Sequence, residues 1–214
     1  MLKVIALDFD GTLVESNNIK DEAFEEIFSD WPQYQHTIIR WCLANNSMDR
    51  RAKCRHFVEQ ILCLKGRDDL VNNLVARYGE LTNQAVSQCD FVIGAKEFLE
   101  YFHGKFPVYL LSATLQEELD KIISARDLNK FFHSIYGAPI NKTLVLKTLA
   151  TLNSATANEV LFIGDSPEDL FAAEKAGVQF VGRASNRNLV SHRTPVFSDM
   201  RGVKKYVVEK FGLR

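Results

Sequence analysis

The sequence predicts an α/β fold, a doubly wound parallel sheet that is interrupted by an inserted α-helical domain. Three observations lead to this fold class. Short apolar runs end in polar clusters, helical patterns separate these runs, and the segment from residue 15 to residue 89 is helical throughout. Alternation of strands and helices is typical of doubly wound sheets. We therefore expect a core domain at 1–14 and 90–214 and a helical insert at 15–89.

The predicted core strands are apolar along their length and do not alternate with polar residues. This pattern indicates strands that are buried on both faces, as in a parallel sheet covered by helices. In chain order these runs are Leu2 to Leu7, Pro107 to Leu111, Val160 to Ile163 and Val178 to Val181. A further run, Ser134 to Gly137, leads toward Lys142.

Three helices of the core are also visible. Ser166 is a good N-cap residue, Pro167 suits the first helical position, and Gly177 ends this helix. A second helix has an apolar stripe of Leu144, Val145, Leu149 and Leu152. The last helix opens at Ser198 and has one apolar face, formed by Met200, Val203, Val207 and Phe211.

The insert is predicted to be helical from the spacing of its apolar residues, for example Phe24, Ile27, Phe28 and Trp31. All four cysteines of the chain lie in this segment, at Cys42, Cys54, Cys63 and Cys89. They form no C-x-x-C pair and have no histidine at zinc-finger spacing. We therefore expect buried free thiols, which behave as small apolar side chains.

Composition excludes several classes of protein. The 214 residues are 46% hydrophobic and 25% charged, which is ordinary for a globular chain. A net charge of −1 offers no basic excess for nucleic acid or for an anionic membrane. No apolar run approaches the ~20 residues of a membrane span, and the N-terminal run is too short for a secretory signal. We expect a cytoplasmic protein, a monomer or homodimer, without nucleic-acid or membrane partners.

Polar residues gather at one edge of the predicted sheet. In open parallel sheets ligands bind beyond the carboxyl ends of the strands. The residues expected there are Asp8, Asp10, Ser112, Asp165 and Asp169. Carboxylates without His or Cys suit a hard cation, Mg²⁺ above all. A carboxylate can also act as a nucleophile and form an aspartyl-phosphate. Asp8 and Asp10 are expected to face the same side, so that one can attack while the other moves protons.

At this point a family resemblance is plain. The segment Asp8-Phe9-Asp10-Gly11-Thr12-Leu13-Val14-Glu15-Ser16 resembles the first signature of the haloacid dehalogenase (HAD) superfamily of phosphohydrolases. Leu110-Leu111-Ser112-Ala113, Lys142 and Gly164-Asp165-Ser166-Pro167-Glu168-Asp169 are similar to its second, third and fourth signatures. The insert resembles the cap of the phosphoglycolate phosphatase and β-phosphoglucomutase branch. The resemblance implies a Rossmann-like core with an inserted helical cap domain.

The resemblance also implies roles for individual residues. Asp8 is expected to be the nucleophile and Asp10 the general acid/base. The expected Mg²⁺ ligands are Asp8, Asp10 through its backbone carbonyl, Asp165, and Asp169 either directly or through a water molecule. The expected contacts to the phosphoryl group are Ser112, Ala113 and Lys142. Members of the superfamily that cleave C–halogen or C–P bonds lack an aspartate at the position of Asp10, so its presence favours phosphate esters.

The insert carries a basic stretch between Arg40 and Arg67, in which Asn46 to Arg51 is predicted to be a loop. In the caps of related enzymes such a loop faces the active site. Arg50, Arg51 and Lys53 are therefore candidate contacts to an anionic part of a substrate, because cationic side chains bind carboxylate and phosphate. An ordinary solvated basic face is the alternative interpretation.

The sequence-based hypothesis is a Mg²⁺-dependent phosphatase that hydrolyses a small phosphorylated metabolite, phosphoglycolate-like or sugar-phosphate-like. Two alternatives remain open. A phosphomutase of the β-phosphoglucomutase type would use the same catalytic residues. A non-catalytic module of the same fold that binds a phosphorylated ligand would keep the site without turnover. One fold hosts many substrates, so the fold does not choose among them.

Overall fold

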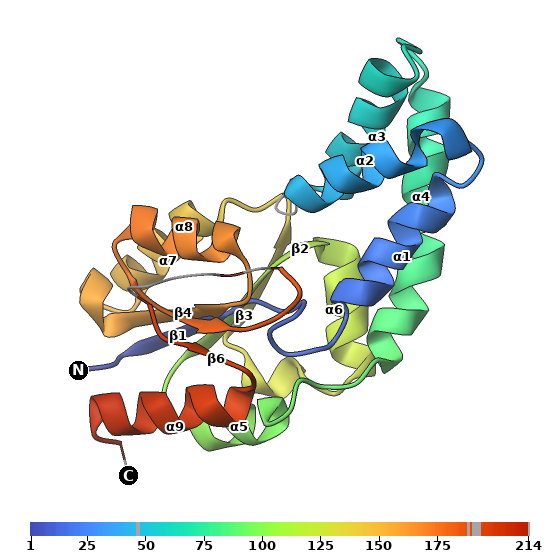
Figure 1. The fold of residues 1–214 in the computed structure, drawn as a ribbon. Coiled ribbons are helices and arrows are strands. Elements are labelled where there is room, and N and C mark those ends of the chain that lie inside the picture. Colours follow the sequence, from blue (N-terminus) through green and yellow to red (C-terminus); the bar gives the residue numbers. More distant parts are fainter. Residues whose placement is uncertain (46–47, 188, 190–193, 214) are drawn as a thin grey trace.

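The core of the molecule is a six-stranded sheet in which every neighbouring pair of strands is parallel (Figure 1). The computed structural model describes residues 1–45, 48–187, 189 and 194–213. The strands are β1 (Val4–Leu7), β2 (Val108–Leu115), β3 (Ser134–Ala138), β4 (Val160–Gly164), β5 (Gln179–Arg183) and β6 (Val196–Phe197). Their order in the sheet is β3-β2-β1-β4-β5-β6. The predicted doubly wound sheet is confirmed.

Strand β1 occupies the centre of this order. β4 ends beside the end of β1, whereas β2 continues past it to Leu115. Leu7 lies opposite Leu110 of β2 on one side and opposite Ile163 of β4 on the other. The chain leaves β1 between the two halves of the sheet, where the strand order reverses. Open α/β sheets bind their ligands at such a switch point.

Helices cover both faces of the sheet and form the insert. The helices are α1 (Asn17–Ile27), α2 (Pro32–Ala44), α3 (Arg50–His56), α4 (Asp68–Gln88), α5 (Ala95–Phe102), α6 (Gln116–Ala125), α7 (Lys142–Leu152), α8 (Pro167–Ala176) and α9 (Met200–Phe211). A π-helical turn spans Phe57–Ile61, and two 3₁₀ turns span Asn129–Phe131 and Ala157–Glu159. None of the described helices is long and apolar enough to cross a membrane.

Each face of the sheet has its own apolar core, because successive strand residues point to opposite faces. Ile5 and Leu7 of β1 pack with α5, α6 and α9, whereas Val4 and Ala6 pack with α7 and α8. Figure 1 shows the two helical layers on either side of the strands. Burial on both faces explains why the strand sequences are apolar throughout.

Helix α8 shows how a local sequence fixes the position of a site residue. The Ser166 hydroxyl accepts a hydrogen bond from the Asp169 backbone N–H, and the Asp169 carboxylate accepts one in return from the Ser166 backbone N–H. Pro167 occupies the first helical position, and Gly177 ends the helix with φ +74°. This reciprocal cap holds the Asp169 carboxylate over the end of β4.

The apolar stripe predicted for helix α7 is wrong in part. Leu144 and Leu152 are 62% and 66% exposed, and the buried leucines are Leu146 and Leu149. Lys142, Leu146 and Leu149 share one face of the helix, since their spacing is four and then three residues. The face of α7 that carries Lys142 is therefore the face that packs against the core.

Two smaller expectations also need correction. The last helix begins one residue later than expected, because Asp199 and not Ser198 is its N-cap and accepts a hydrogen bond from the Gly202 N–H. All four cysteines are free thiols, but Cys63 is exposed and Cys89 is half-buried. Cys63 lies in the turn after the π-helical segment, where its φ of 56° carries the chain toward α4.

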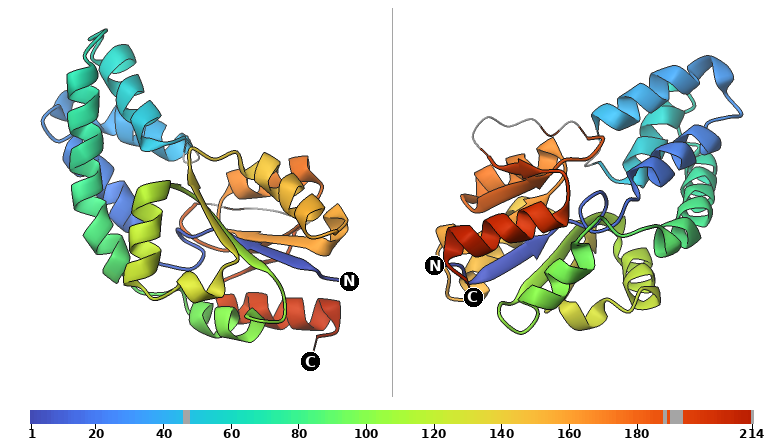
Figure 2. Two further views of the ribbon diagram at one scale, coloured as in Figure 1. Left: turned by 180° about the vertical axis from the view of Figure 1, so that it is seen from behind. Right: turned by 60° about the horizontal axis from the view of Figure 1, so that its bottom comes forward.

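The helical insert between β1 and β2 is confirmed, and its helices stand together at one end of the core (Figure 1 and Figure 2). Its own apolar cluster includes Phe28, Phe57 and Leu74. The two linkers of the insert meet, since the Glu15 N–H donates to the Asp90 carbonyl at 2.9 Å and Val14 forms an antiparallel bridge with Phe91. The residue limits expected for the two domains stay a prediction.

Candidate active site

The loop that follows β1 is held in place by contacts with β4 and β5. The Asp8 N–H donates to the Ile163 carbonyl at 2.9 Å, which ties this loop to β4. Gly11 has φ +73°, and a side chain there would collide with the Asp165 carboxylate. A glycine is therefore required at this turn both for its backbone conformation and for space. Arg183, at the end of β5, donates to the Gly11 carbonyl at 2.9 Å and fixes the turn from the other side.

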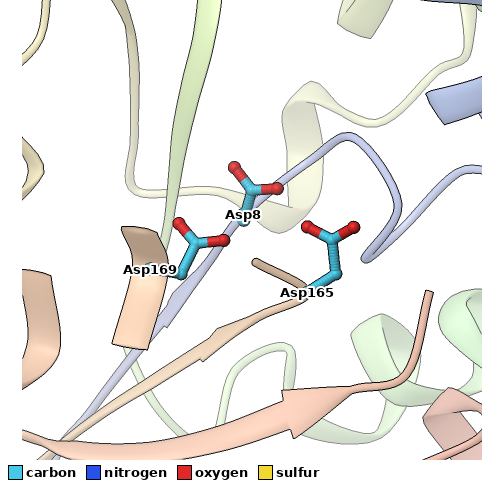
Figure 3. Close-up of side chains that lie close together, drawn as sticks. All are labelled: Asp8, Asp165 and Asp169. Carbon is cyan, nitrogen blue, oxygen red and sulfur yellow. The ribbon is translucent and has the colours of Figure 1, made fainter. Parts of the chain in front are cut away.

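Three buried carboxylates, those of Asp8, Asp165 and Asp169, face a common space (Figure 3). Each offers an oxygen, and these oxygens lie within 4.8 Å of one another. They come from the end of β1, the end of β4 and the first turn of α8. The expected convergence of motifs at the carboxyl edge of the sheet is thus present in the structure.

Lys142 lies between two of these acids. Its ammonium donates to Asp8 Oδ1 at 2.6 Å and to Asp169 Oδ1 at 2.7 Å. Burial alone would lower the pKa of Lys142, but the charges of Asp169 and Asp8 outweigh it and raise that pKa. Lys142 is therefore a fixed cation beside the predicted nucleophile.

Asp165 is held by neutral hydrogen-bond donors. Its Oδ2 accepts from Asn17 Nδ2 at 2.8 Å and from the Ser185 hydroxyl at 2.6 Å. Burial, with the charge of Asp169 added, raises the pKa of Asp165 to about 6. Burial also raises the pKa of Asp8, and the neighbouring carboxylates add to this effect while Lys142 opposes it.

The side chain of Asp10 has a hydrogen-bond network of its own. Lys20 Nζ lies 2.5 Å from Asp10 Oδ2, and the Ser16 hydroxyl donates to Oδ1 at 2.6 Å. Thr114 and Ser112 donate to Oδ2 at 3.1 and 3.2 Å. Burial would raise the pKa of Asp10, but the charge of Lys20 and these hydrogen bonds lower it. Asp10 is thus oriented by residues of both the core and the insert.

A cavity of about 420 Å³ lies over this site, between the core and the insert. Asp8, Asp10, Ala113 and Lys142 line it from the core, whereas Ser112 is fully buried behind Asp10. Apolar side chains of the insert close the opposite wall, among them Phe24, Ile39, Leu43 and Tyr78. The volume suits a small metabolite.

The three cationic residues expected at the cavity have different surroundings. Asn46 and Ser47 of the predicted loop lie outside the described residues, while Arg50 and Arg51 belong to helix α3, which Asp49 caps. Arg50 and Lys53 line the cavity, and Arg50 forms an ion pair with Glu118 of α6. Arg51 is not among the lining residues, and its guanidinium donates to Asn72 Oδ1 at 2.6 Å on the exposed side.

Several residues that touch the site were not predicted from the sequence. Asn17 and Lys20 come from the first turns of α1, and Thr114 from the end of β2. Ser185 and Arg187 follow β5, and Arg187 donates to both carboxylate oxygens of Asp21. The polar residues after β5 could have been found, since they follow an apolar run just as Asp8 and Asp165 do. Nothing in the spacing of α1 marks Lys20.

The three buried acids fit a divalent metal ion. Burial, with the repulsion between the neighbouring carboxylates added, raises the pKa values of Asp8 and Asp165, so a cation bound among these acids would stabilise their charged forms. Lys142 compensates only part of this charge. Hard oxygen ligands without His or Cys match the preferences of magnesium and similar ions.

A parallel sheet with buried carboxylates at its carboxyl edge, and a helical insert after the first strand, defines a class of Rossmann-like α/β enzymes. The family model of haloacid dehalogenase-like hydrolases matches residues 5–183. The chain therefore belongs to the haloacid dehalogenase-like hydrolase family. No curated protein sequence matches the chain.

Solved structures of low sequence identity share the fold. One is described as a predicted phosphoglycolate phosphatase from Haemophilus somnus, with 18% identity, a TM-score of 0.75, and coverage of 96% of this chain and 98% of that one. CbbY from Rhodobacter sphaeroides, in complex with xylulose-1,5-bisphosphate, has 12% identity, a TM-score of 0.72, and coverage of 93% and 95%. A HAD-hydrolase from Bacillus subtilis bound to magnesium has 16% identity, a TM-score of 0.67, and coverage of 97% and 98%.

Proposed function

We propose that this protein is a Mg²⁺-dependent phosphatase that hydrolyses a small phosphorylated metabolite through an aspartyl-phosphate on Asp8. The observation that carries the proposal is the arrangement around Asp8. A buried carboxylate at the end of the central strand has a lysine ammonium at 2.6 Å and faces a cavity of metabolite size. The Bacillus subtilis relative binds magnesium, and CbbY binds a sugar bisphosphate, which supports both the metal and the class of substrate.

Asp8, Asp165 and Asp169 would hold the metal ion, together with the backbone carbonyl of Asp10. Bound Mg²⁺ neutralises the charge of the phosphoryl oxygens and leaves positions for water and phosphate. Lys142 adds a second positive charge beside the transferring group, in a site where positioning and charge stabilisation supply most of the catalysis. Ser112 and Ala113 lie in the second half of β2, and Ala113 lines the cavity, as Asp10 does. We infer that this part of β2 completes the phosphoryl site.

In the proposed reaction Asp8 is the nucleophile and Asp10 transfers the protons. An Asp8 oxygen forms a bond to phosphorus as the bond from phosphorus to the leaving oxygen breaks. Asp10 has to be protonated for this step, against the effect of Lys20 on its pKa, and gives its proton to the leaving oxygen. In the second step the Asp10 carboxylate takes a proton from water as this water attacks phosphorus, and the bond to Asp8 breaks to release phosphate. The contacts of Asp10 with Ser16, Thr114 and Lys20, which hold its carboxylate in one orientation, support this role.

The experiment is a phosphate-release assay with an aryl phosphate and a panel of small phosphate esters, run with Mg²⁺ or with EDTA. We expect Mg²⁺-dependent turnover that Asp8→Asn lowers by at least about 10⁴-fold, since no nucleophile remains. Acid quenching with a ³²P-labelled ester should trap hydroxylamine-sensitive label on the parent protein and none on Asp8→Asn. Isomerised sugar phosphate in place of free phosphate would show a mutase. No turnover of any ester would refute the proposal.

A further inference from the structure

Five cationic side chains line the cavity, and four of them are engaged by carboxylates. The four are Lys20 with Asp10, Lys142 with Asp8 and Asp169, Arg50 with Glu118, and Arg187 with Asp21. The fifth is Lys53. Within the described part of the chain, no carboxylate forms an ion pair with its ammonium, and no side chain or carbonyl accepts a hydrogen bond from it.

Lys53 is also deeply buried. Its residue exposure is 5%, and its Nζ lies 4.9 Å from the centre of the Phe24 ring. A lysine that only fills apolar space extends its ammonium to solvent. Lys53 instead lines the cavity from the side of the insert, where Phe24, Cys42 and Tyr78 also lie.

An unpaired buried ammonium destabilises the folded protein, because it gives up hydration without gaining a counter-charge. Burial lowers the pKa of Lys53 to about 8, with Arg187 and Lys20 adding to this effect and Cys42 and Asp21 opposing it. A side chain of this kind becomes favourable when an anion enters the cavity. Arg50, one helical turn earlier in α3, adds a second donor, since its Nη1 is buried and has no hydrogen-bond partner among the described residues.

We propose that Lys53 is a specificity-determining residue that binds a second anionic group, carboxylate or phosphate, on the leaving-group part of the substrate. This inference rests on the proposed phosphatase function, and it narrows the substrate to phosphate esters that carry a negative charge at both ends. One end meets the phosphoryl site at Asp8 and Lys142, and the other end meets Lys53 on the opposite wall. The apolar lining between them suits a short carbon chain.

The test measures binding, so that it does not depend on turnover. The probes are alkylphosphonates of graded chain length that end in a carboxylate, a phosphonate or a hydroxyl group, titrated calorimetrically in the presence of Mg²⁺. At the best chain length we expect an anionic end to bind about ten- to a hundredfold more tightly than the hydroxyl end. The carboxylate and phosphonate arms distinguish the two possible anions.

The matched variants are Lys53→Met and Arg51→Met, which remove the same charge from the same helix at a lining and a non-lining position. We expect Lys53→Met to abolish the preference for anionic ends and to leave the affinity for the hydroxyl compound within about threefold. Arg51→Met should keep the preference, and Lys53→Arg should restore most of it. These outcomes together would support a contact at Lys53.

Three results would overturn the inference. The parent protein could bind the hydroxyl and anionic compounds equally, Lys53→Met could weaken all compounds alike, or Arg51→Met could reduce the preference as much as Lys53→Met. The phosphatase proposal fails separately, by the absence of phosphate release from the aryl phosphate. If that assay fails while the binding preference depends on Lys53, the anion site stands and the catalytic assignment is wrong.

Discussion

Replacing Lys53 by methionine should stabilise the folded protein in the absence of ligand. Lys53 as a residue is 5% exposed and its ammonium has no carboxylate partner among the described residues, so the folded state carries an uncompensated charge. Methionine keeps most of the apolar stem and fits among Phe24 and Cys42 without any charge. The substitution therefore removes an electrostatic cost and little packing.

The size of the effect follows from the pKa of Lys53. Burial lowers this pKa from 10.5 to about 8. At roughly 1.4 kcal/mol for each pKa unit, the charged form is less stable in the folded protein by about 3 kcal/mol. Loss of the interaction between the ammonium and the Phe24 ring offsets about 1 kcal/mol of this gain. We expect Lys53→Met to raise the free energy of unfolding by about 2 kcal/mol at pH 7.

The difference in stability between Lys53→Met and the parent protein should depend on pH. Between about pH 8 and 10.5 the unfolded chain binds more protons at Lys53 than the folded protein does, so the parent gains stability as the pH rises. Lys53→Met lacks this gain, and its advantage should be full below pH 8 and shrink to nothing near pH 10.5. The pKa of the adjacent Cys42 thiol is raised to about 11, so this thiol stays protonated over most of that window.

The assay is urea unfolding of parent and variant in phosphate-free buffer at several pH values across this range. Arg51→Met is the control, because its exposed guanidinium should leave stability nearly unchanged. A variant that is less stable than the parent at pH 7 would refute the reasoning. So would an advantage that stays constant between pH 7 and the alkaline end.

Three further predictions concern the site itself. Mg²⁺ at about a hundred times its Kd should stabilise the protein by about 3 kcal/mol in a thermal melt, and Asp165→Asn should remove this response. Gly11→Ala should lower the free energy of unfolding in urea by about 2–4 kcal/mol. Gly104→Ala, at a residue with φ +76° and open space around it, should lower this free energy by about 1 kcal/mol. Equal losses of stability would contradict the predicted clash with Asp165. Under the proposed mechanism, Lys20→Met should slow an alkyl ester by about tenfold and an aryl ester less, because only the alkyl leaving group would need the proton of Asp10. Equal slowing of the two esters would argue against a role of Lys20 in positioning Asp10.

The acids of the site could be placed from the sequence because each follows an apolar run. Parallel strands in register bring their carboxyl ends to one edge, so Asp8 and Asp165 had to meet once β1 and β4 were neighbours. The same argument did not extend to Lys20 and Asn17. Their positions depend on how α1 leaves the core and returns over the site, which is a tertiary property that apolar spacing within one helix does not encode.

Helix α7 shows a different limit of sequence-based prediction. Four apolar residues at helical spacing predicted one buried stripe, yet two of them, Leu144 and Leu152, are exposed. The helix has apolar residues on more than one face, so periodicity alone did not determine its orientation. The contacts of Lys142 with Asp8 and Asp169 select the face that is buried, since an ammonium at the start of the helix must reach the site.

The central position of β1 also affects how the chain is made. β1 ends at Leu7, but its neighbours in the sheet, β2 and β4, end at residues 115 and 164. The whole insert is synthesised before β2. At about 5–20 residues per second, a ribosome needs roughly 8–30 s to produce both neighbours. During that time the apolar strand has no sheet to join, whereas the helices of the insert can already pack on one another. The order of translation thus places the helical insert ahead of most of the sheet that it covers.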